Sequence, residues 1–306
     1  MEKPILLLIN LHSRRGLMQF GEVVASFNEL GVQYVIGQVM SPGDFAKCIH
    51  RYHEKVSAVV IGGGDGTLNL AIDALLETGL PLGILPLGTA NDLARTLQLP
   101  LDLAAACAVI AQGQRKAIDL GKVNGKYFFN VASCGLSIAV TEALSGDLKK
   151  RWGVLAYFIA ALKGIARSRK FDVAIAVDDG PREKRRTLQI AVGNGRFYGG
   201  GLAVVDDAAI DDRRLDLYSL EMPHWWHLFT VLPALKLGHQ NENIGIVRWQ
   251  GRKIEVMTRS KKRINTDGEV TTRTPAVFEL CPAALEVFVV PPDQELGGIP
   301  STARIA

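Results

Sequence analysis

The sequence predicts an α/β protein with an N-terminal three-layer parallel-sheet domain, a β-rich antiparallel second domain and an active cleft between them. The first observation is that short apolar strands alternate with helix-like segments as far as Asp119, which indicates a parallel sheet covered by helices. The second is that strand-like runs then follow one another with few helices between them, as in antiparallel sheets. We therefore expect domains at residues 1–120 and 121–306.

Each expected element rests on the spacing of its apolar residues. In the first domain, runs of apolar and often β-branched residues predict the strands Ile5–Ile9, Tyr34–Val39, Ala58–Ile61 and Leu82–Leu85. Apolar residues at intervals of three and four predict the helices Met18–Leu30, Asp44–Tyr52, Thr67–Glu77 and Leu103–Gln112. The second domain is expected to contain the strands Tyr127–Ala132, Phe171–Val177, Thr187–Val192, Leu215–Leu220, Arg252–Val256, Val277–Leu280 and Leu285–Val290. Residues Pro291–Ala306 are expected to form a loop or to return to the first domain.

Composition narrows the class of protein. The 306 residues are 48% hydrophobic and 22% charged, which is typical of a folded globular protein long enough for two cores. The net charge of +4 is too small to indicate nucleic acid, but it suits acidic partners such as nucleotide phosphates or anionic lipids. The four cysteines are widely spaced, which predicts reduced core residues and a cytoplasmic protein. No apolar run reaches the ~18 residues of a membrane-spanning helix.

A glycine-rich turn follows the third predicted strand, in the stretch Ala58-Val-Val-Ile-Gly-Gly-Gly-Asp-Gly-Thr-Leu-Asn69. Strand, glycine turn and helix start together form the layout of a phosphate cradle, because glycines allow the backbone to approach a ligand closely. Asp65 would repel a bare phosphate, so it fits better as a hydrogen-bond acceptor or as a contact to Mg²⁺ on a nucleotide. The alternative is a glycine turn in which Asp65 caps the helix.

A second polar turn ends the fourth predicted strand, in the stretch Leu82-Gly-Ile-Leu-Pro-Leu-Gly-Thr-Ala-Asn-Asp92. With the first motif about twenty residues upstream, the pair resembles the catalytic domain of the diacylglycerol kinase superfamily, in particular the bacterial YegS-like lipid kinases. NAD kinases share the first motif but are not expected to carry the second. The resemblance implies an NAD kinase-like fold for the first domain, with ATP and Mg²⁺ as cofactors.

The resemblance also implies which residues hold ATP: Asn10, Ser13, Ser41, Gly63, Gly64, Asp65, Gly66, Thr67, Leu68, Asn69 and Thr89. The chain departs from the family pattern at three positions of these motifs. Leu11 stands in place of a proline, Arg14 in place of a glycine and Leu70 in place of a glutamate. Arg14 either contacts a phosphate or is a solvated surface residue, and the sequence leaves both alternatives open.

The stretch Ala209-Ile-Asp-Asp-Arg-Arg-Leu-Asp-Leu217 resembles the family's metal loop. The resemblance implies that Mg²⁺ is held by the Asp212 side chain with carbonyls from Ala209 and Arg214, oxygen ligands that suit a hard cation. Arg213 stands where the family has a glycine, so the sequence leaves open whether the turn and its ion are retained. The nearby stretch Gly193-Asn-Gly-Arg-Phe-Tyr-Gly-Gly-Gly201 resembles the family's cleft-lining glycine loop.

Two acids separated by one glycine, in Asn265-Thr-Asp-Gly-Glu269, are the candidates for a catalytic base. Spacing alone favours a hairpin turn at Asp-Gly with both acids in solvent. The resemblance implies instead that the family's proton acceptor lies here. We assign the base to Glu269 with Asp267 in support, keep the reverse assignment open, and add Asp65 as the third catalytic residue.

The sequence thus predicts an ATP- and Mg²⁺-dependent kinase that phosphorylates a diacylglycerol-like lipid and meets the membrane peripherally. Two apolar stretches flanked by cations or tryptophans, Lys149–Lys170 and Pro223–Leu237, fit either core helices or helices that receive lipid. The alternatives are an NAD kinase or other kinase with a soluble acceptor, and a nucleotide sensor without turnover. The oligomeric state is left open, with a homodimer as one alternative.

Overall fold

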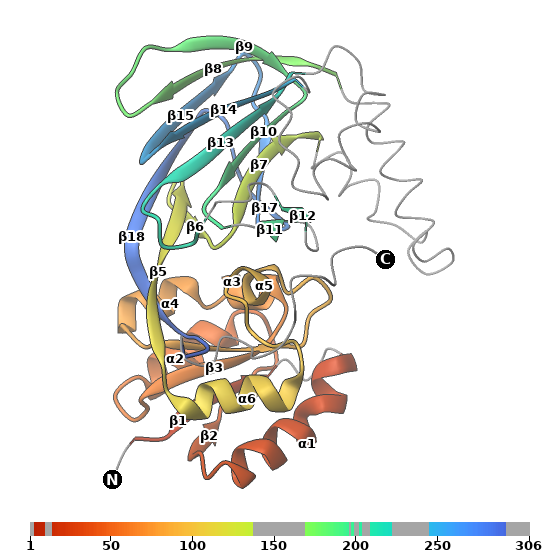
Figure 1. Cartoon of the computed structure of the whole chain (residues 1–306), viewed down its shortest axis with the longest axis vertical. Coiled ribbons are helices and arrows are strands. Elements are labelled where there is room, and N and C mark those ends of the chain that lie inside the picture. The colour runs from red at the N-terminus through yellow and green to blue at the C-terminus, as the bar shows by residue number, and fades with distance from the viewer. Residues whose placement is uncertain are drawn as a thin grey trace, which may run out of the picture. The chain divides into compact units, whose positions relative to one another are not determined.

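The computed structural model describes residues 3–9, 14–136, 169–195, 197–198, 202–203, 209–221 and 245–291, which fall into two compact units (Figure 1). Unit 1 comprises Met1–Gly88, Leu97–Ala117 and Leu285–Ala306, and unit 2 comprises Thr89–Thr96 and Ile118–Ala284. The sequence predicted a single boundary near residue 120. Unit 2 also takes in Thr89–Thr96, which precede that boundary, and the C-terminal segment from Leu285 returns to unit 1.

Unit 1 is built on a parallel sheet with the strand order β2-β1-β3-β4, to which the end of β18 adds a further parallel strand. Its elements are β1 (Ile5–Ile9), α1 (Arg14–Glu29), β2 (Tyr34–Ile36), α2 (Asp44–Tyr52), β3 (Ala58–Gly63), α3 (Asp65–Asn69), α4 (Ile72–Thr78), β4 (Leu82–Pro86) and α6 (Leu103–Gln112). All residues of β1, β3 and β4 are buried, as expected of strands covered on both faces.

Helices pack on both faces of this sheet. Phe27 of α1 and Cys107 of α6 lie in one core cluster with Leu7 of β1 and Val60 of β3. The helices α2 and α4 contact each other, α2 also contacts β1, and the side chains of Leu6, Leu8 and Cys48 all lie close to Gly37. The predicted three-layer α/β arrangement is therefore confirmed.

Unit 2 is β-rich and antiparallel, as predicted. One sheet has the order β14-β13-β10-β7-β16-β17, and the other contains β9, β8, β15 and the start of β18. The elements are α5 (Asp92–Thr96), β5 (Arg115–Val123), β6 (Lys126–Phe128), β7 (Val131–Gly135), β8 (Phe171–Val177), β9 (Glu183–Thr187), β10 (Gln189–Gly193), β11 (Phe197–Tyr198), β12 (Leu202–Ala203), β13 (Leu215–Leu220), β14 (Ile246–Gly251), β15 (Lys253–Thr258), β16 (Arg263–Thr266), β17 (Glu269–Arg273) and β18 (Ala276–Phe288). Apolar side chains from the two sheets, among them Ile175, Val192, Leu217 and Val256, form one core cluster.

Several elements differ from the sequence-based expectation, and the strands β5, β9, β14, β16 and β17 were not predicted. The helix expected over Thr67–Glu77 is two helices, because the amide of Ala71 bonds the carbonyl of Leu68 three residues back and tightens the chain between α3 and α4. The strand expected over Tyr127–Ala132 is broken between β6 and β7. The two strands expected near the end are the single long strand β18.

Cys107 and Cys134 are buried, as expected of core residues, whereas Cys48 and Cys281 are half-buried. Burial raises the pKa of the Cys107 thiol to about 11 and that of Cys134 to about 12, so both stay protonated at neutral pH. In the part of the chain that the structure describes, no helix is long and apolar enough to cross a bilayer.

Candidate functional site

The two glycine motifs of unit 1 meet at the carboxyl ends of β3 and β4. These strands pair in parallel, and the amide of Leu87 donates to the carbonyl of Gly63 at 3.1 Å. A Cβ atom added to Gly64 would lie 3.1 Å from the Cα atom of Gly88, which is closer than nine in ten of the contacts that Cβ atoms make in proteins. The turn between β3 and α3 therefore needs glycine at position 64 because the second motif passes directly against it.

The motif residues after Gly64 form the short helix α3. Asp65 is its first residue and Gly64 its N-cap, so the alternative with Asp65 as cap is not what the backbone adopts. Asp65, Gly66 and Thr67 are partly exposed, whereas the side chain of Leu68 is buried and leaves only its backbone for a ligand. The Asn69 side-chain oxygen is buried and has no hydrogen-bond partner among the described residues.

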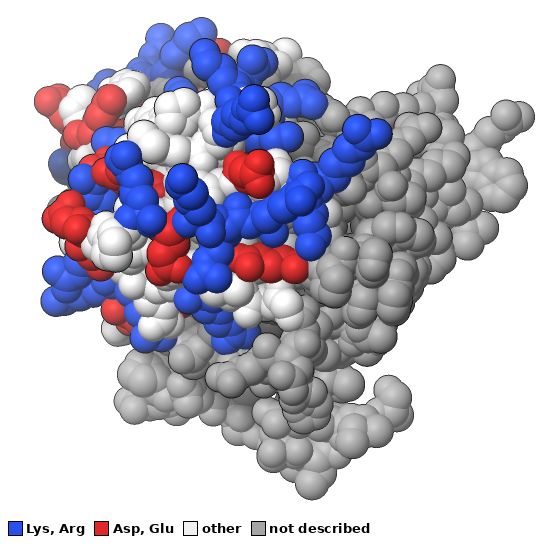
Figure 2. Space-filling model, turned by 90° about the horizontal axis from the view of Figure 1, so that it is seen from above, with Lys and Arg blue, Asp and Glu red and all other residues white. Residues whose placement is uncertain are grey.

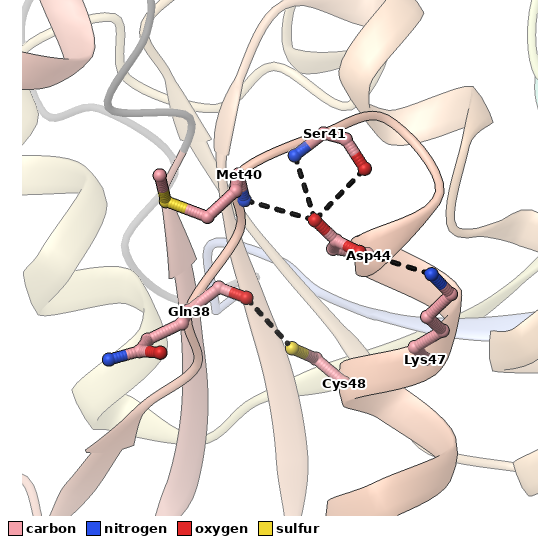
Figure 3. A network of polar contacts seen from close by, with 6 residues as sticks. All are labelled: Gln38, Met40, Ser41, Asp44, Lys47 and Cys48. Carbon is pink, nitrogen blue, oxygen red and sulfur yellow. Dashed lines mark hydrogen bonds and ion pairs between the residues drawn. The ribbon is translucent and has the colours of Figure 1, made fainter.

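Ser41 belongs to a different contact set, shown in Figure 3. Its amide and its hydroxyl both donate to Asp44 Oδ2, at 2.8 and 2.9 Å, and the amide of Met40 donates to the same oxygen at 3.1 Å. The Ser41 hydroxyl is the main cause that holds the pKa of Asp44 below its usual value. The small stability gained from this exposed group is therefore present above the unfolded pKa and lost as the pH falls through the folded one. Ser41 orders the start of α2, so its hydroxyl would have to turn away from Asp44 before it could donate to a nucleotide phosphate.

The remaining predicted nucleotide contacts are not all placed. Asn10 and Ser13 lie outside the described residues. Thr89 is exposed and belongs to unit 2, one residue after the motif leaves unit 1. Arg14 is the first residue of α1.

In unit 2, Asp267 fastens one hairpin to a neighbouring loop. Its carboxylate accepts hydrogen bonds from the amides of Phe129 at 2.7 Å, Asn130 at 3.0 Å and Val131 at 2.9 Å. Asp267 and Gly268 form the hairpin turn between β16 and β17 with positive φ angles of 45° and 102°, as the Asp-Gly spacing favours. The carboxylate, however, is engaged by three backbone amides, and the residue is only partly exposed.

Glu269 starts β17 opposite Thr266 and is exposed. It thus differs from Asp267, which is partly buried and held by three amide donors. Of the two acids, Glu269 therefore has the more accessible side chain.

The loop that Asp267 holds also joins the other motifs of unit 2. The hydroxyl of Thr96, the last residue of α5, donates to Asn130 Oδ1 at 2.8 Å. The amides of Asn194 and Gly195 both donate to the carbonyl of Asn130. A Cβ atom on Gly195 would lie 2.6 Å from Asn130 Oδ1, so the glycine loop needs glycine there.

Sequence reasoning missed Asp119, a buried carboxylate with 2% exposure. Its oxygens accept from the amides of Arg213 at 2.8 Å and Ala283 at 2.7 Å, and its carbonyl accepts from the Asn194 side chain at 3.0 Å. Asp119 thereby joins the predicted metal loop, the glycine loop and β18. The available signal was an acid between Ile118 and Leu120 in a strand that is otherwise apolar at this point.

The predicted metal loop keeps its turn but not an open carboxylate. Arg213 has a φ of 62°, the left-handed conformation that glycine adopts more readily, at a cost of about 1 kcal/mol. Asp212 Oδ2 forms an ion pair with Arg214 Nε at 3.0 Å and accepts from the amide of Ala209 at 3.3 Å. The other oxygen, Oδ1, accepts from the amide of Arg214 at 3.2 Å.

This arrangement does not fit Mg²⁺ as it stands, because the Arg214 guanidinium already supplies the positive charge beside Asp212. Among the described residues there is also no group of three or more His, Cys, Asp or Glu side chains suited to a metal ion. Metal binding through Ala209, Asp212 and Arg214 stays a prediction that requires the Arg214 side chain to move.

We expect Arg214→Leu to create a divalent-cation response at this loop. Removal of the guanidinium leaves the Asp212 carboxylate without its counter-charge, so Mg²⁺ or Mn²⁺ should raise the melting temperature of the variant more than that of the parent. Thermal unfolding with and without each ion measures this. Arg213→Leu is the matched control, because it removes an exposed cation and leaves the Asp212–Arg214 pair in place. An equal ion response in parent and variant would contradict the prediction.

Two family models match the chain. The model of the diacylglycerol kinase catalytic domain covers residues 4–123, and that of the YegS C-terminal NAD kinase beta sandwich-like domain covers residues 130–289. A Pseudomonas aeruginosa protein named a probable YegS-like lipid kinase is 33% identical over 292 residues, which span 94% of this chain and 95% of the relative. A Staphylococcus aureus diacylglycerol kinase is 28% identical over 238 residues, which span 77% of this chain and 75% of the relative.

Solved structures agree with this assignment. A crystal structure from Bacillus anthracis, assigned to a diacylglycerol kinase, matches with a TM-score of 0.81 and 27% identity over 94% of this chain and 98% of that one. An NAD kinase from Archaeoglobus fulgidus in complex with ATP matches with a TM-score of 0.50 and 13% identity over 93% of each chain, a likeness of fold alone. The resemblance and the fold class predicted from the sequence are thus confirmed, and the chain belongs to the family of YegS-like and diacylglycerol kinase-type lipid kinases.

Proposed function

We propose that this lipid kinase uses ATP with Mg²⁺ to phosphorylate the hydroxyl of a diacylglycerol-like lipid. The observation that carries the proposal is the close backbone approach of Gly64 to Gly88. It brings together two motifs that are separate in the sequence, at the strand ends where α/β sheets bind ligands. Family membership supports a lipid as the phosphoryl acceptor. The proposal also includes ATP contacts at Gly63 to Asn69.

The proposed transfer moves one phosphoryl group. The bond between the γ-phosphorus and the bridging oxygen of ATP breaks, a bond from that phosphorus to the lipid oxygen forms, and ADP leaves. Mg²⁺ supplied with the nucleotide neutralises charge on the phosphates. In this proposal Glu269 receives the hydroxyl proton, while Asp267 orders the loop at residues 129–131. An active cleft lined by both units remains a prediction.

The test is transfer of label from ATP labelled at the γ-phosphate, with Mg²⁺ present. We expect label on diacylglycerol in mixed micelles and none on NAD⁺ offered in a parallel reaction. Label on NAD⁺ alone would overturn the lipid acceptor in favour of a soluble one. Nucleotide binding by calorimetry without any transfer to either acceptor would overturn catalysis and favour a nucleotide sensor.

A further inference from the structure

The outer face of the β9-β8-β15 sheet carries a cluster of exposed cations. Val173 and Ile175 of β8 and Val256 of β15 point into the core of unit 2, so the alternate residues of these strands point outward. In the pairing register Lys184, Ala174 and Met257 form one cross-strand row, and Arg186 lies opposite Asp172. Arg259 follows directly at the end of β15. Lys184, Arg186 and Arg259 are all exposed.

The positive charge of the chain is concentrated in the two segments that build this face. Residues 169–187 and 252–263 contain 12 Lys and Arg against 5 Asp and Glu, a formal +7, whereas the whole chain carries only +4. The rest of the chain is therefore net negative. Figure 2 looks onto this part of unit 2 and shows more blue than red side chains across it.

The acids on the face do not cancel this charge. Glu255, which lies beside Met257 on the same face, accepts from Arg182 at 3.1 Å and has Lys253 Nζ at 3.6 Å, so it is balanced within its own surroundings. Asp172 stands directly opposite Arg186. The positive charges of Lys184 and Arg259 therefore remain uncompensated by the described acids of this face and are directed to solvent.

Apolar surface lies at the centre of the cations. A hollow of about 470 Å³ is lined by Ala174 and Met257, by the cations Lys184, Arg186 and Arg259, and by Asp172 opposite Arg186. Met257 is 40% exposed and adds a large apolar side chain to this surface. A ring of cations around an apolar centre matches the chemistry of a bilayer surface, where phosphates lie above acyl chains.

We propose that the cation face, defined as Lys184, Arg186, Arg259, Ala174 and Met257, docks unit 2 on a bilayer that contains anionic lipids. The inference rests on the proposed function, because a kinase of diacylglycerol meets its acceptor in a membrane. Lys and Arg are attracted by the negative surface potential within about a Debye length, roughly 8 Å at physiological ionic strength, so the attraction weakens in salt. Met257 then reaches the level of the head groups.

The test is cosedimentation with phosphatidylcholine vesicles, with and without phosphatidylglycerol, at low and high ionic strength. We expect the parent protein to bind the anionic vesicles and to be released by salt. The variant Lys184→Gln/Arg186→Gln/Arg259→Gln should lose binding on the order of 100-fold, because each cation contributes roughly a factor of five or more near an anionic surface. Met257→Gln should weaken binding to a smaller degree and leave its salt dependence intact.

The matched control is Arg51→Gln/Lys55→Gln/Lys126→Gln, which removes the same charge from exposed positions outside the cation face. Three results would each overturn the proposal. The first is unchanged binding of the face variant, and the second is an equal loss of binding in the control variant. The third is equal binding of the parent protein to neutral and anionic vesicles. Preferential binding to double-stranded DNA over anionic vesicles would overturn it in favour of nucleic acid. Melting temperatures of both triple variants near that of the parent show that the fold is retained.

Failure of the docking proposal and failure of the proposed function give different results. Vesicle binding requires no turnover, so it can hold even if no lipid is phosphorylated. If the protein is a lipid kinase, the face variant should lose activity on acceptor presented in anionic vesicles. It should keep activity on a short-chain, water-soluble diacylglycerol, since none of its residues belongs to the proposed catalytic machinery. Equal loss on both acceptors would overturn the docking role.

Discussion

Glu269→Gln is expected to lower kcat by about 10² to 10⁴ while ATP affinity stays close to that of the parent. The amide keeps the shape of the side chain but cannot accept the hydroxyl proton, and general-base catalysis accounts for losses of this size. Glu269 is exposed and starts a strand, so its replacement should leave the melting temperature unchanged. Steady-state kinetics with both substrates, nucleotide calorimetry and thermal unfolding measure the three quantities.

Asp267→Asn is the companion variant, because it changes a neighbouring acid by the same chemistry with a different expected outcome. The carboxylate now accepts hydrogen bonds from three backbone amides, and the side-chain amide nitrogen of asparagine would face one of them, donor against donor. A buried donor left without an acceptor costs about 1–3 kcal/mol. We therefore expect a lower melting temperature together with changes in both kcat and KM. A silent Glu269→Gln with a pure kcat loss in Asp267→Asn would establish the reverse assignment. Parent-like turnover in both variants would remove this hairpin from the reaction.

Asp65→Asn is expected to reduce turnover by orders of magnitude with the fold retained. Asp65 begins α3 directly after the glycine turn and is partly exposed, so its carboxylate is accessible to a bound nucleotide or its metal ion. The loss should appear in kcat at saturating ATP and Mg²⁺, and the melting temperature should change little. A rate equal to that of the parent would exclude Asp65 from the site.

The control for Asp65 is Asp73→Asn, an exposed acid in the first turn of the next helix. It removes the same charge a short distance along the chain and should leave kinetics unaltered. Equal losses in both variants would point to a general electrostatic effect of the acids rather than to a site at Asp65.

The sequence predicted best where neighbouring residues decide the structure. The buried strands β1 and β4 and the helices α2 and α6 are visible in apolar spacing, and their order implies that Gly64 and Gly88 end adjacent parallel strands. Local spacing could not reveal the three-amide contact of Asp267, because its partners lie 136 to 138 residues away and are backbone groups of ordinary residues.

Contacts that depend on side-chain conformation were equally hidden. The Asp212 carboxylate was predicted to bind a metal ion, but in the structure it pairs with the Arg214 side chain, a choice of rotamer that no spacing encodes. The long strand β18 was divided in two by the Cys281-Pro282-Ala283 interruption, and the pairing with β15 and β4 that carries it through depends on strands far away in sequence. The predicted lipid-facing stretches at residues 149–170 and 223–237 lie outside the described residues apart from Arg169 and Lys170.

The course of β18 has a consequence for biosynthesis on the ribosome. Its last residues belong to unit 1, where Val287 pairs with Leu82 and Phe288 enters the core beside the guanidinium of Arg115. The N-terminal part of the chain thus emerges well before the strand that completes its sheet has been translated, and the edge of β4 stays without that partner in the meantime. Unit 1 can reach its final state only after translation has passed Phe288, so it cannot mature ahead of the rest of the chain.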